Sequence, residues 1–224
     1  EAQEAIEAGK VFFSGRRVTK ASQTLNETGR IQYERAHPYV SRGALKLAGA
    51  INHFKLEPHG LVCLDIGAST GGFTELLILR GAVKIYAVDV GHGQMNPKLI
   101  KDPRVVPLEG VNARDLTAKQ IPQKPQAIVA DVSFISLKLA LPAALAMAEK
   151  GAWLVALVKP QFEVGRENVG KGGIVKDEAA QEAALAEISR WLSQEQAWSV
   201  LGTMQSPITG GDGNREFLIA ATKP

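Results

Sequence analysis

The sequence has little material for crosslinks or metal clusters, because it contains one cysteine among 224 residues. That residue, Cys63, lies inside the apolar run Leu61–Leu64. A single cysteine excludes an intrachain disulfide and a cysteine-based metal cluster, and we expect no metal cofactor. The scarcity of cysteine fits a reducing compartment, so we expect a cytoplasmic location.

The sequence also lacks a long apolar segment. The longest, near Leu137–Met147, is interrupted by Pro142 and followed by Glu149 and Lys150. It is shorter than the roughly 20 residues that a spanning helix needs, so we expect no membrane span. The chain starts at Glu1 without an initiator Met or a signal-peptide core. We therefore expect it to begin partway into a longer protein.

What the sequence does contain is a globular composition with an uneven charge. Hydrophobic residues make up 45% and charged residues 22% of the chain, as in ordinary globular domains. Residues 10–46 hold eight Lys or Arg against two Glu, which makes this segment +6 and the remainder −3. Segregated positive charge suits a polyanionic partner, because phosphate contacts release counterions. On charge alone, a solvated basic surface is the simpler explanation.

The first 35 residues have the pattern of an incomplete small domain. The pattern predicts a helix over residues 2–8, a strand over 11–13, a turn at Ser14-Gly15 and a second strand over 16–20. This is too little chain to fold alone. We therefore place a partial domain and linker at residues 1–35 and the main domain at residues 36–224.

A helix is predicted from Ser41, which is a suitable N-cap residue. One face of this helix carries the apolar residues, and Lys46 lies off that face. The apolar residues are Ala44, Leu47, Ala48, Ile51 and Phe54.

Beyond Gly60, unbroken apolar strands alternate with helical segments, which indicates an α/β fold with a parallel sheet covered on both faces. The pattern ends with a helix over 177–194 and strands near 198–204 and 216–221. The earlier strands are predicted at 61–66, 84–89, 104–108, 126–131 and 153–159, with helices at 73–80 and 136–148.

Polar residues stand at the ends of these strands. Asp65, Asp89, Asp131 and Lys159 each end or nearly end an apolar strand. Ligands of open α/β sheets bind beyond the carboxyl ends of the strands. The turn Gly67–Gly72 allows close approach to a ligand, and the Asp89 carboxylate suits a ribose diol. These residues predict a nucleoside-containing ligand.

Two kinds of ligand fit a glycine turn followed by an acidic strand end. A dinucleotide fold would carry G-x-G-x-x-G, but residue 69 is Ser, and Asp65 before the first glycine would repel a pyrophosphate. A positively charged sulfonium cofactor tolerates that carboxylate. A nicotinamide-dependent oxidoreductase and a tight turn without ligand remain the alternatives.

Six segments carry a more specific resemblance to a known family. They resemble the TlyA, or haemolysin A, family of FtsJ-like ribose methyltransferases. The segments are HPYVSRGALKL (37–47), DIGASTGGFT (65–74), LEGVNARDL (108–116), DVSFISL (131–137), LVKPQFEVG (157–165) and GGDGNREF (210–217).

The resemblance implies a Rossmann-like methyltransferase with a mostly parallel seven-stranded sheet flanked by helices. It implies S-adenosylmethionine as cofactor, 2′-O-methylation of ribosomal RNA as the reaction, and ribosomal RNA or ribosomal subunits as partners. The family carries an N-terminal RNA-binding domain like that of the fourth small-subunit ribosomal protein, and residues 5–20 resemble only its second half. The RNA contacts expected here are Lys10, Arg16, Arg17, Lys20 and Arg42.

The resemblance also assigns a catalytic tetrad of Lys46, Asp131, Lys159 and Glu216, with Lys159 as the base that activates the ribose hydroxyl. Each has an ordinary alternative, because helix lysines are usually solvated and strand-end acids often cap helices. Glu216 fits only if the last strand runs antiparallel, as the resemblance implies. The residues expected around the cofactor are Asp65, Gly67, Ser69, Gly71, Gly72, Phe73, Asp89 and Asn112.

Two questions stay open at this stage. Residues 160–175 contain four glycines and no clear periodicity, which suits a lid, an RNA-contact loop or a long connection equally. The competing functions are an inactive RNA-binding module and a pore-forming haemolysin, and the second is disfavoured by the lack of a spanning helix.

Overall fold

The computed structural model describes residues 2–26, 28–34 and 36–224, and the chain divides into two compact units between Tyr39 and Val40. The sequence predicts the division four residues earlier, after Arg35, which itself lies outside the described residues. Each unit is described by itself.

The first unit is a short helix followed by a three-stranded antiparallel sheet with the order β2-β1-β3. Ser14 and Gly15 both have positive φ, 47° and 80°, which suits the tight turn of a β-hairpin. The predicted second strand is shorter than expected, and β3, whose three residues are all exposed, was not predicted. The elements are α1 (Ala2–Glu7), β1 (Val11–Phe13), β2 (Arg16–Arg17) and β3 (Ile31–Tyr33).

A small apolar cluster holds the first unit together. Ala5, Val11 and Val18 are buried, and Ile6 and Leu25 pack against them. This cluster joins the helix to the hairpin.

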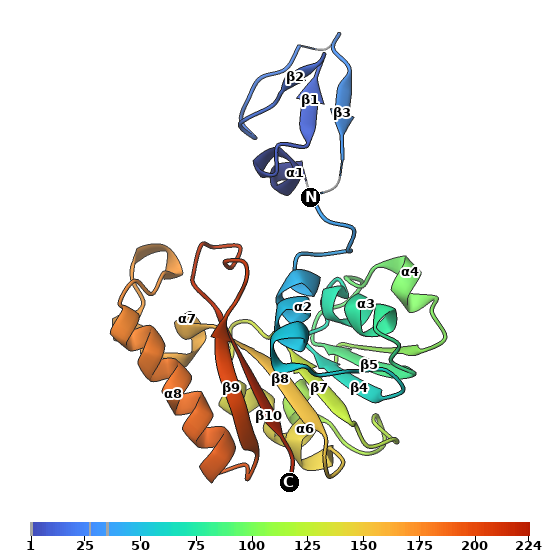
Figure 1. Cartoon of the computed structure of the whole chain (residues 1–224), viewed down its shortest axis with the longest axis vertical. Helices are drawn as coiled ribbons and strands as arrows, with labels where there is room; N and C mark the ends of the chain where they lie inside the picture. Colours follow the sequence, from blue (N-terminus) through green and yellow to red (C-terminus); the bar gives the residue numbers. More distant parts are fainter. Residues whose placement is uncertain (1, 27, 35) are drawn as a thin grey trace. The chain divides into compact units, whose positions relative to one another are not determined.

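The second unit is built on a seven-stranded sheet with the order β6-β5-β4-β7-β8-β10-β9, which confirms the predicted fold class. β4 to β8 pair in parallel, whereas β10 pairs antiparallel with both β8 and β9 (Figure 1). The strands are β4 (Val62–Ile66), β5 (Lys84–Asp89), β6 (Val105–Glu109), β7 (Ala127–Ala130), β8 (Trp153–Val158), β9 (Ser199–Gln205) and β10 (Phe217–Thr222).

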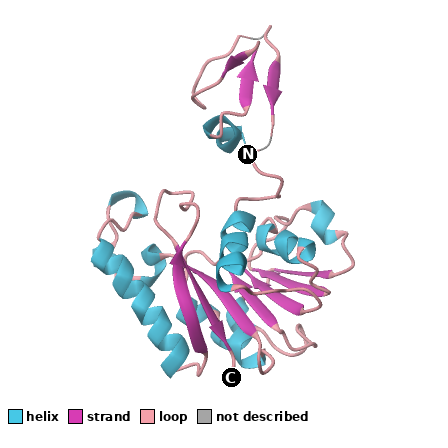
Figure 2. Cartoon of the chain, viewed as in Figure 1, coloured by secondary structure: helices cyan, strands magenta, loops and turns pink. Residues whose placement is uncertain are grey.

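Helices cover both faces of this sheet (Figure 2). The helices α2 (Gly43–Phe54) and α3 (Gly72–Leu79) pack on one face, and α5 (Leu137–Ala140), α6 (Pro142–Met147) and α8 (Glu178–Gln194) lie on the other. Shorter helices occur in the connections. They are α4 (Pro97–Ile100), α7 (Pro160–Glu163), η1 (Ala113–Asp115), η2 (Arg166–Asn168) and η3 (Lys171–Gly173).

The central strands are buried along their whole length. Every residue of β7 and β8 is buried, and Leu64, Ile128 and Leu154 are fully inaccessible. Because both faces are covered, successive side chains are apolar rather than alternating with polar ones. The continuous apolar runs of the sequence are therefore the two-sided core of the sheet. Among the described residues, the structure has no helix with both the length and the apolar character to cross a membrane.

Two local predictions about helices were wrong. The segment 136–148 forms two helices, because Pro142 has no N–H for a helical hydrogen bond and instead starts α6. The helix α2 begins at Gly43 with Arg42 in the N-cap position, so Ser41 does not cap it. The Ser41 hydroxyl instead lies where α2 approaches α3 closely, only 2.1 Å from the position that a Cβ at Gly72 would take.

The C-terminal end of the chain is held to α6 by a lysine. Lys223 Nζ donates hydrogen bonds to the carbonyls of Leu145, Ala146 and Ala148 at 3.0, 3.1 and 2.8 Å. A cation at a helix C-terminus satisfies the last carbonyls and interacts favourably with the helix dipole. Lys223 thus connects the segment after β10 to the C-terminal end of α6.

We predict that Lys223→Met, which keeps the apolar stem, lowers the free energy of unfolding by about 1–3 kcal/mol, because three carbonyls lose a charged donor. Chemical denaturation measures the change. Lys124→Met, at an exposed lysine, is the matched control and should stay within about 0.5 kcal/mol of the parent. Equal effects of the two substitutions would contradict the prediction.

Candidate active site

A cavity of about 410 Å³ opens at the carboxyl ends of β4, β5 and β7. Gly67, Asp89 and Asp131, each directly after or at the end of one of these strands, line it. The order of the sheet reverses between β4 and β7. This reversal point is where open α/β sheets bind their ligands.

The turn after β4 is fixed by close backbone contacts. A Cβ at Gly67, which has φ of 80°, would lie 2.4 Å from the Asp131 carbonyl oxygen, so only glycine fits there. Ser69 N donates to Asp89 Oδ2 at 2.8 Å, and Gly91 N donates to Asp89 Oδ1 at 2.7 Å. Asp89 therefore ties the glycine turn to the end of β5 while each of its oxygens keeps a further lone pair.

The structure brings four of the eight predicted cofactor residues to this cavity, namely Gly67, Ser69, Asp89 and Asn112. The Asn112 Oδ1 also accepts a hydrogen bond from Arg114 N at 3.1 Å and caps η1. The other four, Asp65, Gly71, Gly72 and Phe73, do not line it.

Packing within the protein explains the two glycines behind the cavity. A Cβ at Gly71 would lie 2.2 Å from Leu99 Cδ1, and one at Gly72 would lie 2.1 Å from Ser41 Oγ. These glycines let the start of α3 approach its neighbours closely. Phe73 is buried at the first turn of the same helix.

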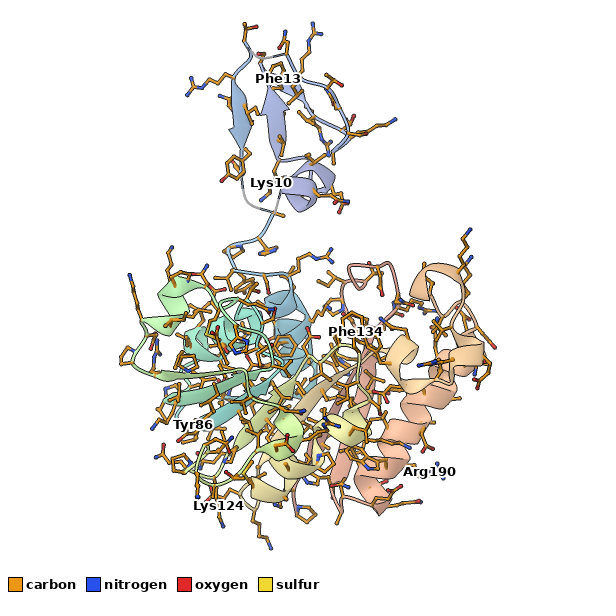
Figure 3. The ribbon with its side chains drawn as sticks, turned by 180° about the vertical axis from the view of Figure 1, so that it is seen from behind. Lys10, Phe13, Tyr86, Lys124, Phe134 and Arg190 are labelled. Atoms are coloured by element: carbon orange, nitrogen blue, oxygen red, sulfur yellow. The ribbon has the colours of Figure 1, made fainter. Side chains whose placement is uncertain are left out.

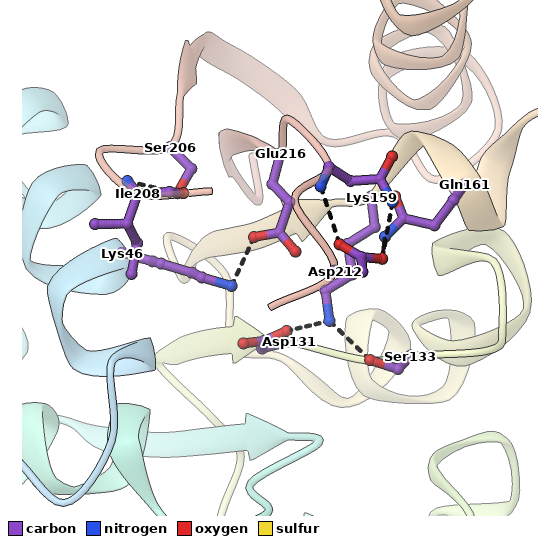
Figure 4. A network of polar contacts seen from close by, with 10 residues as sticks. Lys46, Asp131, Ser133, Lys159, Gln161, Ser206, Ile208, Asp212 and Glu216 are labelled. Atoms are coloured by element: carbon purple, nitrogen blue, oxygen red, sulfur yellow. Dashed lines mark hydrogen bonds and ion pairs between the residues drawn. The ribbon is translucent and has the colours of Figure 1, made fainter. Parts of the chain in front are cut away.

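A second cavity, of about 460 Å³, is lined by Lys46, Lys159 and Glu216. Lys159 Nζ lies 2.6 Å from Asp131 Oδ1, and Lys46 Nζ lies 2.6 Å from Glu216 Oε2 (Figure 4). Lys46, Lys159 and Glu216 are only 7%, 9% and 3% exposed. The structure thus assembles all four predicted tetrad residues as two ion pairs in a largely buried site.

The direction of β10 places Glu216 in this group. Phe217 pairs with Val158 in antiparallel register, so Glu216 before β10 and Lys159 after β8 meet at one edge of the sheet. Lys46 reaches the same edge from α2, the helix that packs against β8, β9 and β10. Among the described residues, no group of three or more His, Cys, Asp or Glu is arranged to hold a metal ion.

Sequence reasoning assigned no role to Ser133 and Phe134, which line both cavities. Lys159 Nζ lies 2.8 Å from Ser133 Oγ. Phe134 (Figure 3) is 91% exposed and has φ of 65°, and its ring lies 5.2 Å from that of Phe162. An exposed aromatic residue with positive φ is costly and marks functional loops. The available signal was a phenylalanine placed in a loop soon after a strand-end aspartate.

The segment 160–175 forms part of the wall of the second cavity through Val169, Gly172 and Gly173. The buried Asn214 holds it in place. Its Nδ2 donates to Gly173 O at 2.9 Å, and its Oδ1 accepts from Val175 N at 3.0 Å. This segment is therefore tied to the loop that precedes β10.

Four of the predicted RNA contacts belong to the first unit. Arg16, Arg17 and Lys20 are exposed there, and Lys10 is partly buried. Arg42 belongs to the second unit, at the start of α2. The structure thus divides the predicted RNA contacts between the two units.

The family of FtsJ-like methyltransferases matches residues 39–223, which include every wall of both cavities. The chain belongs to this family. The methyltransferase is 45% identical over 223 residues to the 16S/23S rRNA (cytidine-2'-O)-methyltransferase TlyA of Mycobacterium tuberculosis, covering 98% of the chain and 82% of that relative.

Solved structures share the fold of this methyltransferase. A protein described as a hemolysin from Streptococcus thermophilus is 40% identical, with a TM-score of 0.84, over 99% of this chain and 82% of that one. An S-adenosylmethionine-dependent methyltransferase from Listeria monocytogenes shares the fold alone, at 15% identity and a TM-score of 0.57, over 80% of this chain and all of that one.

Behind the glycine turn of this methyltransferase lies a buried carboxyl. Asp65 is inaccessible, and its Oδ2 accepts a hydrogen bond from Thr74 Oγ at 2.6 Å. Its Oδ1 is buried without a hydrogen-bond partner among the described residues. Burial raises the pKa of Asp65 to about 7, against the Thr74 hydrogen bond and with a smaller contribution from the Asp131 charge. The uncharged form of Asp65 is therefore favoured below neutral pH.

This shift predicts how the stability of the methyltransferase depends on pH. The unfolded Asp65 loses its proton near pH 3.8 and the folded one near pH 7, so the free energy of unfolding falls as pH rises through this window. Three pKa units correspond to about 4 kcal/mol. Asp65→Asn should remove this component and be the more stable form at pH 8.

Denaturation of both forms between pH 4 and pH 8 measures the effect. Asp115→Asn, at an exposed carboxyl, controls for the loss of a charge. Parallel stability curves for Asp65→Asn and its parent would show that Asp65 does not carry the pH dependence.

Proposed function

We propose that this chain is an S-adenosylmethionine-dependent methyltransferase that methylates the 2′-hydroxyl of ribose in ribosomal RNA. The observation that carries the proposal is the presence of two ion pairs, Lys159–Asp131 and Lys46–Glu216, in which every side chain except that of Asp131 is buried. Lys46, Lys159 and Glu216 line the second cavity, and Asp131 lines the cavity at the glycine turn. The two cavities share Ser133 and Phe134. One site would therefore place a cofactor beside groups that can activate a hydroxyl.

The first cavity fits the proposed cofactor. Its volume of about 410 Å³ lies in the range of roughly 300–1,000 Å³ typical of small-molecule sites. Asp89 would accept hydrogen bonds from the ribose diol, Gly67 and Ser69 would lie along the methionine part, and Asn112 would meet the adenine edge. When bound, S-adenosylmethionine supplies an electrophilic methyl group.

The four predicted cofactor residues that do not line the first cavity would instead support the glycine turn that forms one of its walls. Gly71, Gly72 and Phe73 allow the close packing of α3 behind the turn. Asp65 connects β4 to the first turn of α3 through Thr74. We propose that these residues hold the turn in the conformation that receives the cofactor.

The ion pairs give each tetrad residue a role. Lys159, in the form whose amine has already given up its proton, would take up the proton of the 2′-hydroxyl, and Asp131 would hold Nζ in position for it. Lys46, held by Glu216, would add positive charge beside the oxygen as it becomes negative. Preorganised charges in a site with little water stabilise developing charge more strongly than they would in bulk water.

Ribosomal RNA is the proposed substrate because two independent features favour it. Arg16, Arg17 and Lys20 form an exposed basic group in the first unit, which suits contact with phosphates. The Mycobacterium tuberculosis relative is named for methylation of ribosomal RNA at cytidine. Ribosomal subunits are then the proposed partners, and the cytoplasm is the proposed location.

The decisive experiment incubates the whole 224-residue chain with radiolabelled S-adenosylmethionine and separated ribosomal subunits, and then maps the label. We expect label on ribose 2′-oxygens of ribosomal RNA. Label on a base would overturn the assignment of the hydroxyl. Cofactor binding without any label would favour an RNA-binding module, and the absence of both would overturn the proposal.

We predict that Lys159→Ala lowers kcat by about 10²–10⁴-fold, the usual contribution of a general base. Its affinity for S-adenosylmethionine, measured by calorimetry, should change little because Lys159 does not line the first cavity. Lys150→Ala, at an exposed lysine, should behave as the parent. Near-normal transfer by Lys159→Ala with intact cofactor binding would remove Lys159 from the mechanism.

We predict that the double substitution Arg16→Ala and Arg17→Ala weakens RNA binding and makes it less dependent on salt. Each lost phosphate contact lowers the slope of log K against log salt by about 0.7–0.9. Both side chains are exposed, so thermal stability should be unchanged. Binding measured at several salt concentrations would contradict the prediction if the slope stayed the same.

A further inference from the structure

Glu163 is a partly buried carboxyl to which the proposed mechanism assigns no role. It ends α7, four residues after Lys159. Burial raises its pKa, against hydrogen bonds from Ser136 and Leu137 and the more distant charge of Lys138. A carboxylate that is removed from water needs hydrogen-bond donors in place of its hydration. The donors that Glu163 uses therefore show which segment it holds in place.

Both partners of Glu163 lie at the end of the loop after β7. Ser136 Oγ donates to Glu163 Oε2 at 2.6 Å, and Leu137 N donates to Glu163 Oε1 at 2.9 Å. The carboxylate thus satisfies a free N–H at the start of α5. The neighbouring charges, Lys138 and Glu187, pair with each other.

The same two segments meet at two more points. Lys159 Nζ contacts Ser133 Oγ at 2.8 Å, and the ring of Phe162 lies 5.2 Å from that of Phe134. We call residues 131–137 and 159–163, with these contacts, the loop clamp. At one end of the loop clamp, Ser133 contacts the proposed base Lys159. At the other end, Ser136 and Leu137 contact Glu163.

The loop between these contacts needs support. Phe134 combines a positive φ with nearly complete exposure. Such backbone strain persists only where the surrounding structure over-determines it. The contacts at Ser133 and at Ser136 and Leu137 lie on either side of Phe134, so they restrict the loop from both ends.

We propose that Glu163 is a positioning residue for methyl transfer, which acts by holding Ser133 against Lys159 and Phe134 against Phe162. The inference rests on the proposed function and extends it, because it concerns how the Nζ of Lys159 is aimed. Glu163 touches no reacting atom. It sets the place of Ser133, and Ser133 sets the direction of Nζ.

The test measures kcat with saturating ribosomal subunits for Glu163→Ala, Ser133→Ala and the double variant. We expect each single variant to lose about 10- to 100-fold, as small misplacements of a catalytic group do. The double variant should lose about as much kcat as the more strongly affected single variant, because both changes break one connection. Losses that multiply in the double variant would overturn the proposal.

Glu163→Gln tests whether the hydrogen bonds are the cause. Its oxygen can accept from Leu137 N, and its amide can donate to Ser136 Oγ, so it should restore most of the lost kcat. A Glu163→Gln variant as slow as Glu163→Ala would overturn the proposal. Glu182→Gln, at an exposed residue of α8, is the matched control.

Two further measurements separate the possible failures. Thermal denaturation and S-adenosylmethionine binding identify variants that do not fold, and Glu163→Asp, which is too short to make both contacts, then replaces Glu163→Ala in the cycle. A parent chain that transfers no methyl group would overturn the proposed function itself. Normal kcat in a folded Glu163→Ala variant would overturn only the role of Glu163.

Discussion

The polar site depends on the direction of a single strand. β10 runs against β8 and β9, and its first residue therefore lies at the edge where the parallel strands end. This brings the carboxylate of Glu216 beside the lysine that follows β8. A parallel strand in the same place would put Glu216 at the far edge of the sheet. The ion pair with Lys46, and with it the part of the second cavity wall that Glu216 forms, follows from this one reversal.

Four charged groups at one sheet edge are expensive to desolvate, and their pairing decides whether the fold tolerates them. Breaking a buried ion pair leaves one charge uncompensated, which costs more than the intact pair contributes to stability. Asp65 shows a different solution, in which a buried carboxyl with one hydrogen bond has a raised pKa. The site therefore combines paired charges at the cavity with a readily protonated acid behind it.

The sequence was a good guide wherever function coincided with strand patterning. Asp89, Asp131 and Lys159 end continuous apolar runs, and parallel pairing alone brings such ends together. Lys46 was different, because its burial depends on how α2 packs, and the resemblance rather than the helical pattern identified it. The pairing of β1 with β3 in the first unit was missed, because β3 is only three residues long and so gives little sequence signal.

The roles of Gly71, Gly72 and the loop after β7 follow only from the three-dimensional structure. Gly71 and Gly72 follow a ligand-binding pattern, yet their missing side chains leave room for Leu99 and Ser41. Ser133, Phe134 and Glu163 acquire meaning only from contacts between segments far apart in the chain. Because Ser133 and Phe134 form a wall common to both cavities, a ligand on one side that shifts this wall changes affinity on the other. By thermodynamic linkage, each ligand changes the affinity for the other by the same factor. The proposed cofactor would therefore alter the affinity for the proposed RNA substrate, and the RNA would alter the affinity for the cofactor equally.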